Sequence, residues 1–188
     1  MKRKILFAIV AVVCPLLCGS SPDYASAKRK LEQIESDRLP AGARVTLTPQ
    51  ELNAWVLEQA REAFPDGVRR PAITLGPGQA TGTALIDFGK IRRAQGHPPG
   101  WLASRLLDGE RPVTVTARLR SGSGRATVDV ESVEIAGVAI NGPLLDFLIR
   151  NYLLSSYPAA KVGEPFEMGH RIDRIEVLPS AVHVWIGR

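Results

Sequence analysis

The sequence contains almost none of the residues that carry redox or thiolate chemistry. Its two cysteines, Cys14 and Cys18, both lie near the amino terminus, in a segment with the features of an export leader. The rest of the chain has no thiol, which excludes disulfides, cysteine nucleophiles and thiolate metal sites from it. We expect no cofactor.

Other catalytic signatures are missing as well. The three histidines, at positions 97, 170 and 183, form no HExxH or paired metal spacing. Ser123 lacks the first glycine of a GxSxG nucleophile elbow, and a hairpin turn accounts for it. The carboxylates are spread over different predicted strands, so no pair is expected to shift a pKa. We therefore predict a protein that is not an enzyme, with no metal site.

The amino terminus resembles a secretory signal. Residues 2–4 are basic, residues 5–17 form an apolar run, and Ala25-Ser26-Ala27 is a small-x-small cleavage site. We predict cleavage after Ala27 and an exported protein, periplasmic or otherwise extracytoplasmic. The alternative is a lipid anchor at Cys18, which Leu17 disfavours because a small residue is wanted there. The leader also carries part of the net charge of +5, and no basic aromatic platform for nucleic acid follows.

The predicted organisation is a signal peptide over 1–27, a charged helix or linker over 28–43, and a single domain over 44–188. The domain begins with a firm helix signature. Thr48, Pro49 and Glu51 form a capping box with proline at the first helical position. Leu52 and Val56 begin an apolar stripe at helical spacing.

Beyond this helix the apolar residues alternate with a period of two. Three hairpins are predicted, with turns at Gly76-Pro77-Gly78, at residues 121–124 and at Pro179-Ser180. The apolar phase slips by one at Glu131-Ser132, which predicts a β-bulge. We predict an α+β fold: a curved antiparallel sheet of about six long strands in hairpins, whose concave face is covered by two to three helices.

A short, very apolar helix is predicted within "GPLLDFLIRNYLLSSYP", residues 142–158. It is too short to span a bilayer, which needs about 20 apolar residues. On a helical wheel Leu148 lies at the centre of a broad core half that also holds Leu144 and Tyr152. Phe147 and Leu154 form a second apolar stripe on the polar half. Either another element covers this stripe, or it lines a lipid groove or touches a membrane surface.

The order of motifs resembles small envelope proteins of the YpmS and LmeA kind, which are similar to tubular lipid-binding (TULIP-like) and AsmA-like domains. Two patterns carry the resemblance, over about residues 44–187. One is a helix start of the form "threonine, polar, x, LN", and the other is a strand ending in "V-x-I-x-G-x-x-I" before an apolar helix. The matching residues are Thr48, Leu52 and Asn53 for the first, and Val133, Ile135, Gly137 and Ile140 for the second.

The resemblance implies that the protein binds or carries a lipid or other amphiphile in an apolar groove in the cell envelope. Lys90, Arg92 and Arg93 are candidates for holding an anionic headgroup. The alternative is a packed structural module that docks a protein partner in the envelope. The candidate groove residues are Phe147, Leu154, Leu144, Tyr152, Trp101 and Leu102.

Overall fold

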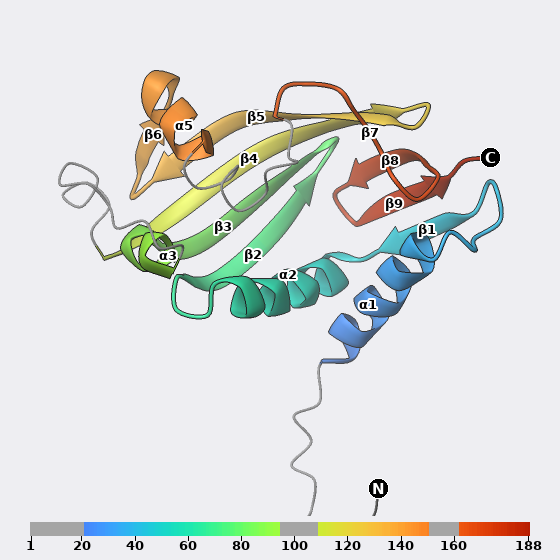
Figure 1. Ribbon diagram of the computed structural model, residues 1–188, viewed down its shortest axis with the longest axis horizontal. Helices are drawn as coiled ribbons and strands as arrows, with labels where there is room; N and C mark the ends of the chain where they lie inside the picture. The colour runs from blue at the N-terminus through green and yellow to red at the C-terminus, as the bar shows by residue number, and fades with distance from the viewer. Residues whose placement is uncertain (1–20, 95–108, 151–161) are drawn as a thin grey trace, which may run out of the picture.

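The computed structural model describes residues 21–94, 109–150 and 162–188 (Figure 1). The protein has an α+β fold with antiparallel sheets, as predicted. The main sheet is open and has the order β2-β3-β4-β5-β6, with β7 paired to the start of β5. Its strands are β2 (Val68–Gly76), β3 (Gln79–Asp87), β4 (Glu110–Gly122), β5 (Arg125–Ile135), β6 (Val138–Ile140) and β7 (Phe166–Glu167).

A second, smaller sheet is joined to the ends of the main-sheet hairpins. It has the order β1-β9-β8, formed by β1 (Arg44–Leu47), β9 (Ala181–Ile186) and β8 (Ile172–Leu178). The Gly78 N–H donates to the Val177 carbonyl at 2.9 Å, where the β2–β3 turn meets β8. The Ser121 hydroxyl both donates to the carbonyl and accepts from the N–H of Ile175, each at 2.7 Å. Side chain and turn backbone thus satisfy the outer edge of β8.

The three predicted turns and the predicted bulge are confirmed. The β4–β5 register runs from Thr116 opposite Ser132 directly to Ala117 opposite Val130, so Glu131 is the extra residue. This extra residue restores the apolar phase, since Val133 and Ile135 then share a face with Val115.

One face of the main sheet is polar. Arg120 pairs with Asp129 across β4 and β5 at 2.6 Å, and Arg118 pairs with Glu131. The hydroxyls of Thr81 and Thr116 lie 3.0 Å apart across β3 and β4. These cross-strand pairs fit a solvated sheet face.

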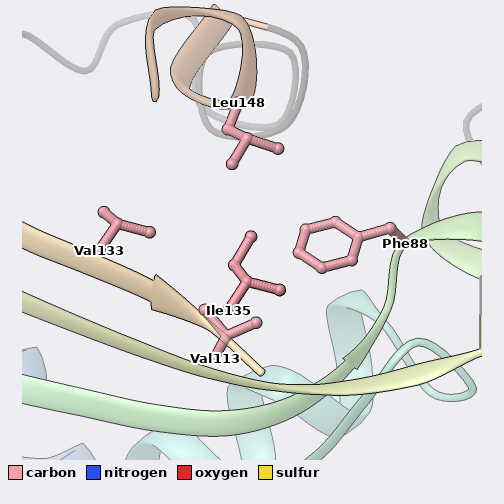
Figure 2. Close-up of a cluster of buried hydrophobic side chains, with 5 residues drawn as sticks. All are labelled: Phe88, Val113, Val133, Ile135 and Leu148. Carbon is pink, nitrogen blue, oxygen red and sulfur yellow. The ribbon is translucent and has the colours of Figure 1, made fainter. Parts of the chain in front are cut away.

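The opposite face is apolar on every long strand, because the alternate residues of the register are aliphatic. They are Ile73, Leu75, Ala80, Ala84, Ile86, Val113, Val115, Ala117, Leu119, Ala126, Val128, Val130, Val133 and Ile135. One end of this face is covered by helix α5 (Gly142–Leu148). Figure 2 shows Leu148 of α5 pointing down onto Val133 and Ile135, with Phe88 entering from the side. Leu148 is buried, as predicted for the centre of the core half.

A second core lies under the small sheet. Ile34 of helix α1 (Pro22–Glu35) packs with Val45, Val184 and Ile186. A charged helix or linker was predicted over residues 28–43, and residues 28–35 belong to α1. Helix α1 starts at Pro22 and packs against helix α2 (Pro49–Ala63) (Figure 1), because its apolar residues extend upstream to the buried Ala27.

The start of α2 is built around a buried carboxylate. The predicted capping box is present: the Glu51 N–H donates to the Thr48 hydroxyl, and the Glu51 carboxylate accepts from the Thr48 N–H at 2.8 Å. The same carboxylate accepts from Ser26 Oγ at 2.6 Å and from Lys30 Nζ at 2.6 Å and 2.8 Å. Burial by itself raises the pKa of Glu51, but the hydrogen bonds from Lys30, Ser26 and Thr48 outweigh it and hold the pKa below its usual value.

Asn53, singled out by its motif, lies against the outer edge of β2. Its side-chain amide donates to the Ile73 carbonyl at 2.9 Å and accepts from the Ile73 N–H at 2.7 Å. It also donates to the Pro49 carbonyl at 2.8 Å. The amide therefore takes the place of a neighbouring strand at this edge and fixes α2 along β2.

We predict that Asn53→Leu lowers the free energy of unfolding by about 1–3 kcal/mol, because it leaves the polar groups of Ile73 without their partner. Urea denaturation measures the change. The matched substitution Gln50→Leu, at an exposed position of α2, should change stability by no more than about 0.5 kcal/mol. Equal effects at the two positions would show that Asn53 does not anchor the edge.

We also predict that Glu51 contributes pH-dependent stability. A carboxylate with a lowered pKa in the folded state stabilises it above the unfolded value of 4.5, and the contribution is lost as pH falls through the folded pKa. The stability difference between the unaltered protein and Glu51→Gln should therefore shrink below pH 4.5. Glu58→Gln, which removes an exposed pair with Arg61, is the matched control. A pH-independent difference for Glu51→Gln contradicts the prediction.

Candidate functional site

Helix α3 (Phe88–Ala94) links the apolar face to a charged pocket. It follows directly from the last residue of β3, Asp87, whose carboxylate accepts from the Lys90 N–H at 2.8 Å. Phe88 points into the cluster beneath α5 (Figure 2), while Ile91 is buried against Gly67. The short helix α3 therefore contacts the apolar cluster through Phe88 and the loop at Gly67 through Ile91.

A glycine is needed at position 67 because the Ile91 side chain lies very close to its backbone. A Cβ at this position would lie 2.5 Å from Cγ1 of Ile91, closer than side chains can tolerate. The Gly67 carbonyl also accepts from the Asp87 N–H at 2.9 Å. The loop after α2 is thereby held against both the end of β3 and α3.

Between this loop and α3 lies a cavity of about 340 Å³. Its apolar lining comes from Phe64, Pro65 and Ile91, and its charged lining from Asp66, Lys90 and Arg93. Lys90 and Arg93 are exposed, so their charges stand at the mouth of the cavity. A small apolar recess with two cations at its rim suits an anionic group joined to a short apolar segment.

The two cations at the pocket, Lys90 and Arg93, are only partly neutralised by nearby carboxylates. Asp87 is buried, and its Oδ2 lies 3.9 Å from Nζ of Lys90, a long ion pair. The guanidinium of Arg93 lies over the backbone of Gly89. A Cβ on residue 89 would be 3.4 Å from the guanidinium nitrogens of Arg93. Gly89 thus leaves room for the guanidinium. Asp66 places one carboxylate opposite these two cations at the pocket.

The apolar face forms the other part of the candidate site. Helix α5 and Phe88 cover one end of this face, and β8 contacts β4 near Ser121, toward the other end. Between them Ala117, Leu119 and Val128 are only half-buried. At the margin near β6, Leu144 is 42% exposed and Val138 is 62% exposed. Among the described residues, the aliphatic face is therefore buried beneath α5 and half-buried along the middle of β4 and β5.

The structure brings together two of the three predicted headgroup residues, Lys90 and Arg93. Arg92 lies on α3, but its side chain is outside what the structure describes, as is that of Phe147. Trp101, Leu102, Tyr152 and Leu154 lie outside the described residues.

The prediction that Leu144 lies on the core half of the apolar helix is wrong, because its side chain is exposed. It lies in the first turn of α5, beside the three-residue edge strand β6, and the packing of α5 passes through Leu145 and Leu148 instead.

The pocket residues Phe64, Pro65, Gly67 and Ile91 were not recognised from the sequence, because their signal is a loop that only the fold brings against α3. Within residues 21–94, 109–150 and 162–188, no group of three histidine, cysteine or acidic residues could hold a metal ion. Among the helices in these ranges, none is long and apolar enough to cross a membrane.

Comparison with protein-family models and with curated proteins returns no match for the chain. The resemblance to tubular lipid-binding envelope proteins therefore stays a prediction.

Proposed function

We propose that the protein is a non-catalytic binder or carrier of an amphiphile with an anionic headgroup in the cell envelope. The observation that carries the proposal is the division of the main sheet. One face bears cross-strand ion pairs and hydroxyls, while the other is aliphatic on every long strand and, in the part of the chain that the structure describes, half-buried along the middle of β4 and β5. A solvated outer face and a half-shielded apolar inner face suit a groove for acyl chains.

The energetics of such a groove are favourable without any specific polar contact. Burying one methylene contributes roughly 0.8 kcal/mol, so ten methylenes contribute about 8 kcal/mol before the entropic cost of association. Side chains such as Ala117 and Val128 present small aliphatic surfaces along which a chain could lie. Selectivity would then depend on the headgroup.

The headgroup is assigned to the pocket beside α3. Lys90 and Arg93 stand at its mouth and α3 also carries Phe88 into the apolar cluster, so one helix joins the cationic and apolar parts. A phosphate or carboxylate would gain charge-assisted hydrogen bonds from both cations. Asp66 and Asp87 would weaken this attraction and make it sensitive to salt.

The second candidate function is a module that docks a protein partner in the envelope. It is favoured by Val138 and Leu144, two exposed aliphatic side chains at the β6 edge of the main sheet. An exposed edge strand can accept a strand from another chain. This function would need no lipid.

We predict that the purified protein binds dodecyl phosphate saturably, and that Lys90→Gln/Arg93→Gln weakens binding about three- to tenfold at low salt, since each exposed charge contributes up to about 1 kcal/mol. Isothermal titration measures the affinity. The control Lys28→Gln/Arg29→Gln removes two exposed charges from α1 and should leave the affinity unchanged. Equal weakening by both double variants would remove the headgroup assignment. Absence of saturable binding, with no lipid in an organic extract, would leave the docking module.

A further prediction separates surface from core on α5. Leu148→Ala should cost about 2–5 kcal/mol of stability, because Leu148 is buried in the cluster. Leu144→Ser should change stability by no more than about 0.5 kcal/mol, since Leu144 is exposed, while lowering the affinity for dodecyl phosphate. Thermal and urea unfolding together with titration test both. Equal destabilisation at the two positions would mean that Leu144 is part of the core.

A further inference from the structure

Helix α1 crosses the point at which the sequence predicts export cleavage. The helix runs from Pro22 to Glu35, and the predicted cut follows Ala27. The amino-terminal cap and the first turn of the helix lie upstream of that cut. The Ser21 hydroxyl accepts from the Tyr24 N–H at 3.2 Å, the Ser21 carbonyl accepts from the Ala25 N–H at 3.0 Å, and Pro22 occupies the first turn.

The residues just before the predicted cut are part of the packed domain. Ala27 is only 1% exposed, the lowest exposure among the buried hydrophobic residues of the described chain. Ser26 donates to the buried Glu51 carboxylate at 2.6 Å. Helix α1 packs against α2, and Ser26 takes part in this contact through Glu51.

A chain starting at Lys28 would lose these contacts and gain an unfavourable charge. The shortened helix would keep only residues 28–35 and would carry a new α-ammonium at its amino end, beside Lys28, Arg29 and Lys30. Positive charge at this end opposes the helix dipole, and so short a helix is marginal by itself. The complete helix instead has Asp23 in its first turn, where a negative charge is favourable.

We propose that the export leader is removed on the amino-terminal side of Ser21, so that all of α1 belongs to the mature protein. The step is the hydrolysis of one peptide bond by water, catalysed by a leader peptidase of the exporting cell. It leaves a carboxylate on the leader and an α-ammonium on the mature chain. The small residues Gly19 and Ser20 follow the apolar run closely and meet the side-chain requirement for such a cut.

The first test is the amino terminus itself. The full chain with a carboxy-terminal tag is expressed in an exporting bacterium, recovered from the envelope fraction and analysed by amino-terminal peptide mass spectrometry. A start at residues 18–21 is expected, and a lipid-modified Cys18 would locate the cut within that range. A start at Lys28, or an unprocessed Met1, overturns the proposal.

Two substitutions in the full chain provide an independent test. Ala25→Leu removes the small residue three positions before the predicted cut, and processing should be unaffected if the cut lies upstream. Ser26→Ala should lower the Tm of the exported protein by about 2–6 °C, because the hydrogen bond to Glu51 is lost. Ser36→Ala, with an exposed hydroxyl on the last turn, serves as the control. Accumulated precursor in Ala25→Leu, or an unchanged Tm in Ser26→Ala, would mean that residues 21–27 leave with the leader.

Discussion

The packing of the amino-terminal elements α1, β1 and α2 depends on the hydrogen bonds and the ion pair made by the buried Glu51 carboxylate. It closes the capping box of α2, accepts from Ser26 and Lys30 of α1, and through Lys30 reaches the Thr46 carbonyl of β1. A carboxylate this buried is tolerated only when its oxygens are hydrogen-bonded and its charge is paired. The Glu51 side chain therefore ties α1, α2 and β1 together, in addition to the apolar packing of Ile34 against Val45.

The same requirement shapes the sheet edges. Asn53 supplies an amide to the edge of β2, and Ser121 supplies a hydroxyl to the edge of β8. Both side chains replace a missing strand and so remove polar edge groups that would otherwise invite pairing with another chain. Asn53 acts at the β2 edge of the main sheet and Ser121 at the β8 edge of the small sheet, and the main sheet stays open. An open sheet with one aliphatic face is the shape that the proposed groove requires.

The candidate site depends on how α3 is placed between two environments. Gly67 allows Ile91 to approach the loop after α2, and this contact turns Lys90 and Arg93 toward the pocket while Phe88 enters the apolar cluster. A side chain at Gly67 would displace the helix and separate the two parts. The placement of Lys90 and Arg93 at the pocket and of Phe88 in the apolar cluster, all on one short helix, is what favours an amphiphile over a purely polar ligand in the proposed function.

The sequence by itself determined the local structure. The capping box at Thr48 and Glu51, the hairpin turns, the bulge at Glu131 and the burial of Leu148 all follow from short-range patterns, because caps, turns and alternation depend on neighbouring residues. Only the tertiary structure decided the long-range contacts: Lys30 with Glu51, Asn53 with Ile73, and Gly67 with Ile91. It also decided that α1 begins at Pro22 and that Leu144 is exposed, since both depend on which surface lies opposite. Partners far apart in the chain leave no periodic signal, so their pairing appears only when the sheet and helices bring them together.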